Sequence, residues 1–176
     1  MKPQWIESFF KFCPNCSLEN PDAGAIPFKC QECGFAQFFG PVAAVGGLIC
    51  DDQNRLLLVR RARAPGKGKW GLPGGFVDRD ESIEQALARE VLEETSLRVV
   101  QSEYLMSGPN QYDYRGMVAA VIDLFYTCQV DQADAISLAP DELEHHEWVR
   151  PTDAHLQQMA FPSNRLAIEY WLSLNS

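Results

Sequence analysis

The chain has 176 residues, of which 46% are hydrophobic and 22% charged, so it can form one full globular domain and a small additional unit. Its longest apolar run, residues 42–50, is far shorter than the roughly 18 residues of a membrane-spanning helix, and we expect no membrane association. The net charge of −9 argues against nucleic acid as a partner, because phosphate neutralisation needs a basic surface. The first residues, with an acidic Glu7 and no small-residue cleavage site, do not resemble a signal peptide, so we expect a cytoplasmic protein.

Residues 1–38 hold two Cys-x-x-Cys pairs, formed by Cys13, Cys16, Cys30 and Cys33. Each pair predicts a tight turn that presents two thiolates, and two such turns complete a closed tetrahedral site for structural Zn²⁺. So short a segment cannot bury a sufficient core, and the ion should supply much of its folding free energy. Redox-active pairs are the weaker alternative, since two spaced pairs fit a zinc ribbon better, and disulfides are disfavoured in the cytosol.

This segment is rich in phenylalanine and poor in basic residues, with Lys11 and Lys29 the main ones. We therefore expect its aromatic side chains to pack against the following domain or a second subunit rather than to bind nucleic acid. The residues concerned are Phe9, Phe10, Phe12, Phe28, Phe35, Phe38 and Phe39.

Residues 39–176 show strand and helix patterns. We predict strands at 42–50 and 55–61, joined as a hairpin by a polar turn, and then loops at 64–69 and 71–76. A helix at 82–95 should follow, starting with a capping box from Ser82 to Gln85. Further strands are expected near 99–106, 117–130 and 147–149, and a final helix at 164–174. This order of elements indicates an α/β sandwich.

The helix at 82–95 carries acidic side chains beside its apolar face. At about 100° per residue, Leu87 and Val91 mark the apolar stripe. Glu90 and Glu94 project almost along this stripe, and Glu93 lies further round. A solvated charged helix would place its acids opposite the stripe.

Three carboxylates at i, i+3 and i+4 converge on a small volume, where they repel one another. Arg89 can reach Glu93 one turn along, but a single guanidinium cannot neutralise three acids. Mg²⁺ or Mn²⁺ can, particularly when substrate phosphates complete the coordination shell. An ordinary helix with a salt bridge is the alternative.

The loop before this helix reads Leu72-Pro73-Gly74-Gly75. Glycines let the backbone approach a ligand and free amides to face phosphate oxygens, so we expect Gly74 and Gly75 to admit a diphosphate. Five basic residues lie just upstream and suit a small anionic ligand, although a solvated loop explains them equally well. We assign Arg60 to the substrate; the others are Arg61, Arg63, Lys67 and Lys69.

Gly75, five residues, Glu81, seven residues and then Arg89-Glu90-Val91-Leu92-Glu93-Glu94-Thr95-Ser96-Leu97 resemble the Nudix box at every defined position but one. The resemblance implies a Nudix α/β/α sandwich with a mixed sheet, and hydrolysis of a nucleoside diphosphate linked to another group. It implies that Glu90, Glu93 and Glu94 are ligands of Mg²⁺ or Mn²⁺, that Glu81 is a supporting acid and that Arg89 orients the glutamates. Ser96 stands where the family has glycine, which would suit a left-handed helix end. Serine in that conformation should cost on the order of 1 kcal/mol, so the departure bears on how the helix terminates and not on catalysis.

Many Nudix enzymes use a further glutamate outside the box as base or metal ligand. The acidic segment before the late tryptophan-containing strand resembles the region that supplies it, and we predict Glu142, with Glu144 and Glu147 as alternatives. An acidic surface loop explains any one of these acids equally well. His145 and His146 could bind metal, but paired loop histidines are more often merely exposed.

A ribbon followed by this domain resembles NADH pyrophosphatases and short zinc-ribbon Nudix proteins, in which a homodimer is common, so we expect a homodimer. The Ser-Gln-Pro-Trp-Pro-Phe segment of the NADH-cleaving group is missing, which argues against NADH. Tyr112 and Tyr114 could stack on a base or ribose and Arg115 could pair with a phosphate, unless they are ordinary strand residues. ADP-ribose, a dinucleotide such as FAD or a nucleoside triphosphate stay open as substrates. The competing function is a nucleotide-sensing, RNA-binding or RNA-decapping protein with weak catalysis.

Overall fold

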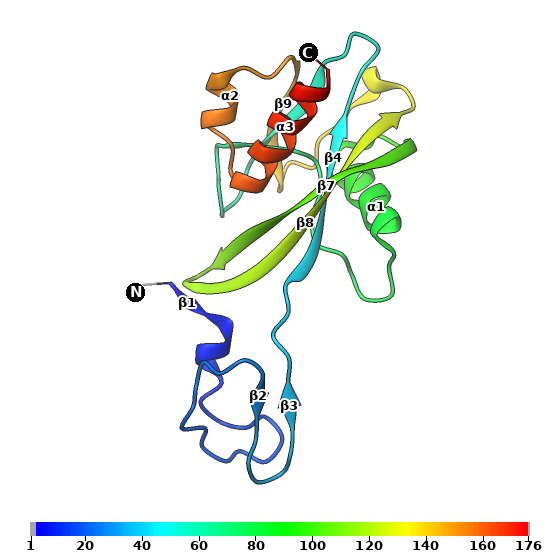
Figure 1. Cartoon of the computed structure of the whole chain (residues 1–176). Helices are drawn as coiled ribbons and strands as arrows, with labels where there is room; N and C mark the ends of the chain where they lie inside the picture. Colours follow the sequence, from blue (N-terminus) through cyan, green and yellow to red (C-terminus); the bar gives the residue numbers. More distant parts are fainter. Residues whose placement is uncertain (1–2, 176) are drawn as a thin grey trace. The chain divides into compact units, whose positions relative to one another are not determined.

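The computed structural model describes residues 3–175, which form two compact units. The first unit contains the chain up to Val42 together with Gln111–Val121, and the second contains Ala43–Asn110 and the chain from Ile122 onward. Figure 1 traces both units in sequence colours. None of the helices in the described range has both the length and the apolar character needed to cross a bilayer.

The first unit is built around the cysteine pairs. Its regular elements are short: β1 (Gln4–Trp5), the 3₁₀ helix η1 (Ile6–Phe9), β2 (Phe28–Lys29) and β3 (Ala36–Gln37). Strands β2 and β3 pair antiparallel, and β1 pairs parallel with Met117 and Val118.

The two cysteine turns share one hydrogen-bond pattern. The amide of Ser17 donates to Cys13 O at 2.8 Å, and the amide of Gly34 donates to Cys30 O at 3.2 Å. The four sulfur atoms all lie within 4.8 Å of one another, with 3.6 Å between Cys13 and Cys33 and between Cys16 and Cys30. Tetrahedral Zn–S bonds of about 2.3 Å would place sulfurs about 3.8 Å apart, so the spacing fits the ion.

The phenylalanines of this unit divide into two groups, which corrects the expectation that all of them pack outward. Four surround the buried Cys13 and Cys30 and form the core of the unit itself: Phe10, Phe28, Phe35 and Phe39. The physical reason is that so small a unit must use its large aromatic side chains to bury the cysteines, because little other apolar surface is available to it. Phe9, Phe12 and Phe38 are exposed.

The second unit is a three-layer α/β/α arrangement, as expected (Figure 1). Its strands are β4 (Val42–Ile49), β5 (Leu56–Arg61), β6 (Trp70–Gly71), β7 (Val99–Tyr114), β8 (Met117–Val130) and β9 (Leu143–Val149). Its helices are α1 (Ile83–Thr95), α2 (Asp153–Gln157), α3 (Pro162–Leu174) and the short η2 (Ala133–Ala135). Parts of β4, β7 and β8 extend into the first unit.

Two hydrophobic clusters lie on opposite sides of the strands. Leu57 and Val59 of β5 pack in the cluster that contains α1, whereas Leu56 and Leu58 pack in the cluster that contains α3. Successive strand residues point to opposite faces, so a continuous apolar strand serves both layers.

The predicted hairpin of the first two long strands is wrong. β4 belongs to the sheet of β1, β8 and β7, while β5 lies between β6 and β9 in a second sheet. Among the described residues, Cys50, just after the end of β4, forms an isolated bridge with Leu56. The reason is that one edge of β4 is hydrogen-bonded to the loop that contains Pro73 and Gly75, so β5 has no edge to pair with.

Other boundaries differ less. β7 runs to Tyr114, well past the predicted end near residue 106, and α2 was not predicted. His145 and His146 lie in β9 opposite Arg60 and Val59, not in a loop. Pairing of β9 with β5 brings them into the sheet. The seven residues of β9 are mostly charged or polar and alternate too weakly to predict a strand.

The start of α1 matches the sequence-based expectation, and its end keeps the left-handed form despite the serine. Gln85 N–H donates to Ser82 Oγ at 3.2 Å and Ser82 N–H donates to Gln85 Oε1 at 2.8 Å, which completes the capping box. Ser96 has the left-handed φ of 62°, and its amide donates to Leu92 O. The helix therefore ends as a glycine-terminated helix would, with a serine in the strained position.

Replacing Ser96 with glycine should stabilise the protein. Glycine removes a left-handed strain of about 1 kcal/mol, while the exposed hydrogen bond from Ser96 Oγ to Ser137 O offsets part of the gain. Urea unfolding of Ser96→Gly should give a higher free energy of unfolding than wild type, with Ser96→Val lower. Equal values for the three proteins would contradict this account.

The first unit should depend on bound zinc. Cys16→Ser removes one thiolate ligand and should lower the zinc content well below one ion per chain, whereas Cys50→Ser, a thiol outside the cluster, should not. Metal analysis of the purified proteins measures this directly. A strong chelator should also broaden the NMR resonances of residues 10–39 in wild type. Full zinc content in Cys16→Ser would contradict a four-cysteine site.

Candidate active site

A glycine-containing loop lies along the edge of β4. The amide of Val45 donates to Gly75 O at 2.9 Å, and the amide of Gly47 donates to Pro73 O at 2.8 Å. Gly74 has a φ of +148°, and a Cβ there would collide with Val45 O. Only glycine fits this close approach of two backbones, so the loop is held in a fixed position.

Glu94 is the buried acid of the site. Its side chain comes from α1, the residue is 5% exposed, and its Oε2 accepts a hydrogen bond from Gly74 N–H at 2.9 Å. Burial raises the pKa of Glu94 to about 8, with Glu90 and Glu142 adding to the rise, while Gly74 and Arg61 lower it. The amide of Gly74 is therefore engaged with Glu94 rather than pointing freely at a phosphate.

Glu90 lies directly against Gly75. A Cβ on Gly75 would come within 2.5 Å of the Glu90 carboxylate, so the second glycine makes room for this acid. Burial raises the pKa of Glu90 and the Arg89 guanidinium lowers it, with Glu93 and Glu142 raising it further. Buried Glu94 and half-buried Glu90 thus both meet the loop, in which Gly74 permits the close backbone approach and Gly75 leaves room for the Glu90 carboxylate.

Arg89 holds the remaining acids. Its Nε donates to Glu81 Oε1 at 2.7 Å and its Nη2 donates to Glu81 Oε2 at 2.9 Å. Its Nη1 donates to Glu90 at 2.8 Å and, as its spacing predicted, to Glu93 at 3.2 Å. A further bond to Phe76 O fixes the guanidinium to the glycine loop, and hydrogen bonds with Glu81 and the helix acids raise the pKa of Arg89.

The donor set of this cluster fits a divalent cation. Glu90, Glu93 and Glu94 offer hard carboxylate oxygens, Glu93 has a side chain 60% exposed, and Arg89 is shared among several acids. Within residues 3–175, only the cysteine set brings its ligand atoms within 4.8 Å of one another, so the glutamate oxygens are more widely spread. The Arg89 guanidinium donates hydrogen bonds to Glu90 and Glu93, whereas the Gly74 amide donates to Glu94. The unbalanced negative charge is what a cation would neutralise.

Of the three candidate acids outside the helix, Glu142 lies beside the cluster. The amide of Ala139 donates to Glu94 O at 3.0 Å, which ties this segment to the end of α1. The charge of Glu142 also raises the pKa values of Glu90 and Glu94. Glu147 instead contacts His145 at 3.3 Å and His155 at 3.8 Å, and it lies opposite Leu58 in the register of β5 and β9.

The structure separates Arg60 from Arg61. The Arg60 guanidinium stacks over Trp70 at 4.5 Å from the ring centroid, on the face of β5 that carries Leu58. Arg61 is the arginine that lowers the pKa of Glu94, and its guanidinium lies 5.2 Å from the Phe161 ring centroid. Sequence reasoning did not single out Arg61, although the alternation from Leu57 and Val59 indicates its side of the strand. Arg60 as a substrate contact stays a prediction.

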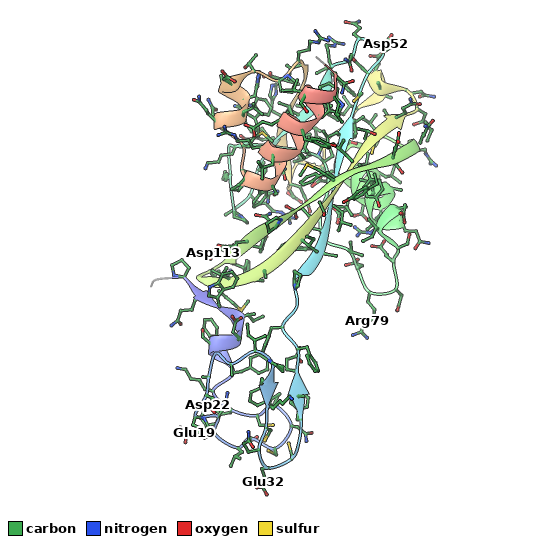
Figure 2. All side chains as sticks on the ribbon, in the orientation of Figure 1. Glu19, Asp22, Glu32, Asp52, Arg79 and Asp113 are labelled. Carbon is green, nitrogen blue, oxygen red and sulfur yellow. The ribbon has the colours of Figure 1, made fainter. Side chains whose placement is uncertain are left out.

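Tyr112 and Arg115 belong to the first unit, so their predicted contact with the substrate stays a prediction. Arg115 lies over the Tyr114 ring at 5.3 Å from its centroid. Acidic side chains also project from this unit, including the labelled Glu19, Asp22 and Glu32 (Figure 2).

Comparison with known proteins identifies the family. Residues 40–170 match the NUDIX domain. The chain is 40% identical over 87 residues to an ADP-ribose pyrophosphatase of Methanocaldococcus jannaschii, covering 48% of this chain and 50% of that protein. It is 28% identical over 156 residues to the NAD-capped RNA hydrolase NudC of Mannheimia succiniciproducens, covering 82% of this chain and 55% of that protein. The chain thus spans about half the length of these curated relatives.

A solved structure supports the same identification. The NUDIX domain of Shewanella oneidensis NrtR, in a cocrystal structure with ADP ribose, has a TM-score of 0.63 and 30% sequence identity. The match covers 79% of this chain and 91% of that one. With its glycine loop, its arginine-held glutamates and its α/β/α layers, this chain belongs to the NUDIX hydrolase family.

Proposed function

We propose that this chain is a metal-dependent pyrophosphohydrolase that cleaves the phosphoanhydride of a nucleoside diphosphate linked to another group. The observation that carries the proposal is the set of acids packed against Gly74 and Gly75, with Glu94 buried and Glu142 beside it. A protein that only bound nucleotides would gain nothing from several mutually repelling carboxylates.

ADP-ribose is the proposed substrate. The names of one relative and of one structural neighbour refer to this compound, which supports the choice. The missing Ser-Gln-Pro-Trp-Pro-Phe segment argues against NADH, and the net charge of −9 argues against capped RNA.

The residues of the site have distinct proposed roles in the hydrolysis. Glu90, Glu93 and Glu94 would hold Mg²⁺ or Mn²⁺, and Arg89 with Glu81 keeps Glu90 and Glu93 in place. The bound cation would supply charge stabilisation of the diphosphate and a lowered pKa for water. Glu142 accepts the proton of the attacking water as its oxygen bonds to phosphorus. The bond from that phosphorus to the bridging oxygen breaks, and AMP and ribose 5-phosphate leave.

A substrate panel tests the function. Wild type should hydrolyse ADP-ribose with Mg²⁺ or Mn²⁺ in preference to NADH, FAD, nucleoside triphosphates and NAD-capped RNA. Glu94→Gln should lower kcat by about 100-fold or more, because it removes a ligand charge. Glu84→Gln, on the exposed face of the same helix, is the matched control and should retain activity. A wild type that binds ADP-ribose but hydrolyses none of the panel would instead favour a nucleotide sensor.

The same substitution should affect stability in the opposite direction. Ionised Glu94 is unfavourable in its buried position, as its raised pKa shows, so the folded metal-free protein loses stability as the pH rises above the carboxyl's usual pKa. Glutamine keeps an acceptor for Gly74 N–H and carries no charge. Thermal unfolding of metal-free Glu94→Gln at pH 8 should therefore give a Tm above that of wild type, and a lower Tm would contradict the burial argument.

A further inference from the structure

Arg63 forms an ion pair with Glu142. Its Nη2 lies 2.7 Å from Glu142 Oε2, with side chains 57% and 32% exposed. The backbone joins the same two segments, because the amide of Ala62 donates to Glu142 O at 2.7 Å. Both the main chain and the side chain of residue 142 are therefore bonded to consecutive residues of one loop.

This loop is closed by its own hydrogen bonds. The amide of Gly68 donates to Arg61 O at 2.8 Å, and the amide of Lys69 donates to Gly66 O at 3.0 Å. Arg61 Nε donates to Pro65 O at 2.7 Å. Arg63 thus starts from a fixed backbone, so holding Glu142 costs side-chain entropy but little further backbone entropy.

Glu142 needs such a partner. Its segment is tied to the end of α1 by the bonds from Ala139 N to Glu94 O and from Ser137 N to Thr95 O. Repulsion by the nearby Glu90 and Glu94 would turn an unpaired carboxylate toward solvent. A charge-assisted hydrogen bond from arginine opposes that rotation and selects one orientation of the carboxylate.

We propose that Arg63 is a positioning residue for Glu142, fixing the carboxylate that receives the proton of the attacking water. The proposal rests on the proposed function, in which Glu142 is the acid outside the helix. It differs from a direct contact between Arg63 and a substrate phosphate, which the following double-mutant cycle distinguishes.

Four proteins form the cycle: wild type, Arg63→Ala, Glu142→Gln and the double variant, assayed with ADP-ribose and Mg²⁺. Arg63→Ala should lower kcat about tenfold with little change in KM, less than the roughly 100-fold cost of a 1 Å misplacement. Arg63→Lys should recover part of the loss, since a single hydrogen bond is replaced. In the Glu142→Gln background, Arg63→Ala should change kcat by less than about twofold. Arg165→Ala, which breaks an equally short exposed pair with Glu169, is the control.

A second measurement does not depend on activity. In metal-free protein, ¹⁵N relaxation of the Arg63 side chain should show an ordered Nε–H in wild type and a mobile one in Glu142→Gln, with Arg165 unchanged between them. Equal mobility of Arg63 in the two proteins would overturn the proposal. Additive losses in the cycle, or a loss confined to KM, would overturn it in favour of a phosphate contact. A wild type without hydrolysis would refute the proposed function, and the positioning role with it.

Discussion

Electrostatic repulsion among carboxylates is the constraint on which the second unit's site depends. The acids of α1 lie beside an apolar face, where the burial of Glu94 and the half-burial of Glu90 reduce solvent screening of their charges. Arg89 bonds to Glu81, Glu90 and Glu93, and a backbone amide holds Glu94. These contacts keep the acids close together but leave excess negative charge, which is the condition under which a divalent cation binds strongly.

The glycine loop connects that charge cluster to the fold. Its hydrogen bonds occupy one edge of β4, and this pairing sends β5 into a second sheet. The same loop makes room for Glu90 at Gly75 and binds Glu94 at Gly74. One short segment therefore determines both the division of the strands between two sheets and the geometry of the acids.

The features that follow from local sequence were predictable, and those that follow from long-range pairing were not. The capping box at Ser82 and the clustering of the four cysteines each depend on side chains within a few positions or on ligand number. The hairpin prediction failed because β4 and β5 are apolar on both faces, so their sequence indicates burial but not the partner strand. From the sequence we assigned Arg60, and not Arg61, to the substrate. The two arginines differ in the face of β5 on which they lie, and the register between β5 and β9 shifts between them. The predicted roles of the glutamates came from the resemblance to the Nudix box. No local sequence pattern could predict the ion pair between Arg63 and Glu142.

The division of the chain into units has a consequence for how it can be shortened. A fragment that begins after the cysteine segment keeps the tip of the β7–β8 ribbon, Gln111–Val121. It lacks the residues with which this tip forms one compact unit. In the intact protein β1 covers Met117 and Val118, and Gln4 N–H donates to Gly116 O at 2.9 Å. Deleting residues 1–42 would expose these backbone groups. An exposed strand edge can then pair with a strand of another molecule. A minimal catalytic fragment would therefore have to trim this ribbon as well as the cysteine segment.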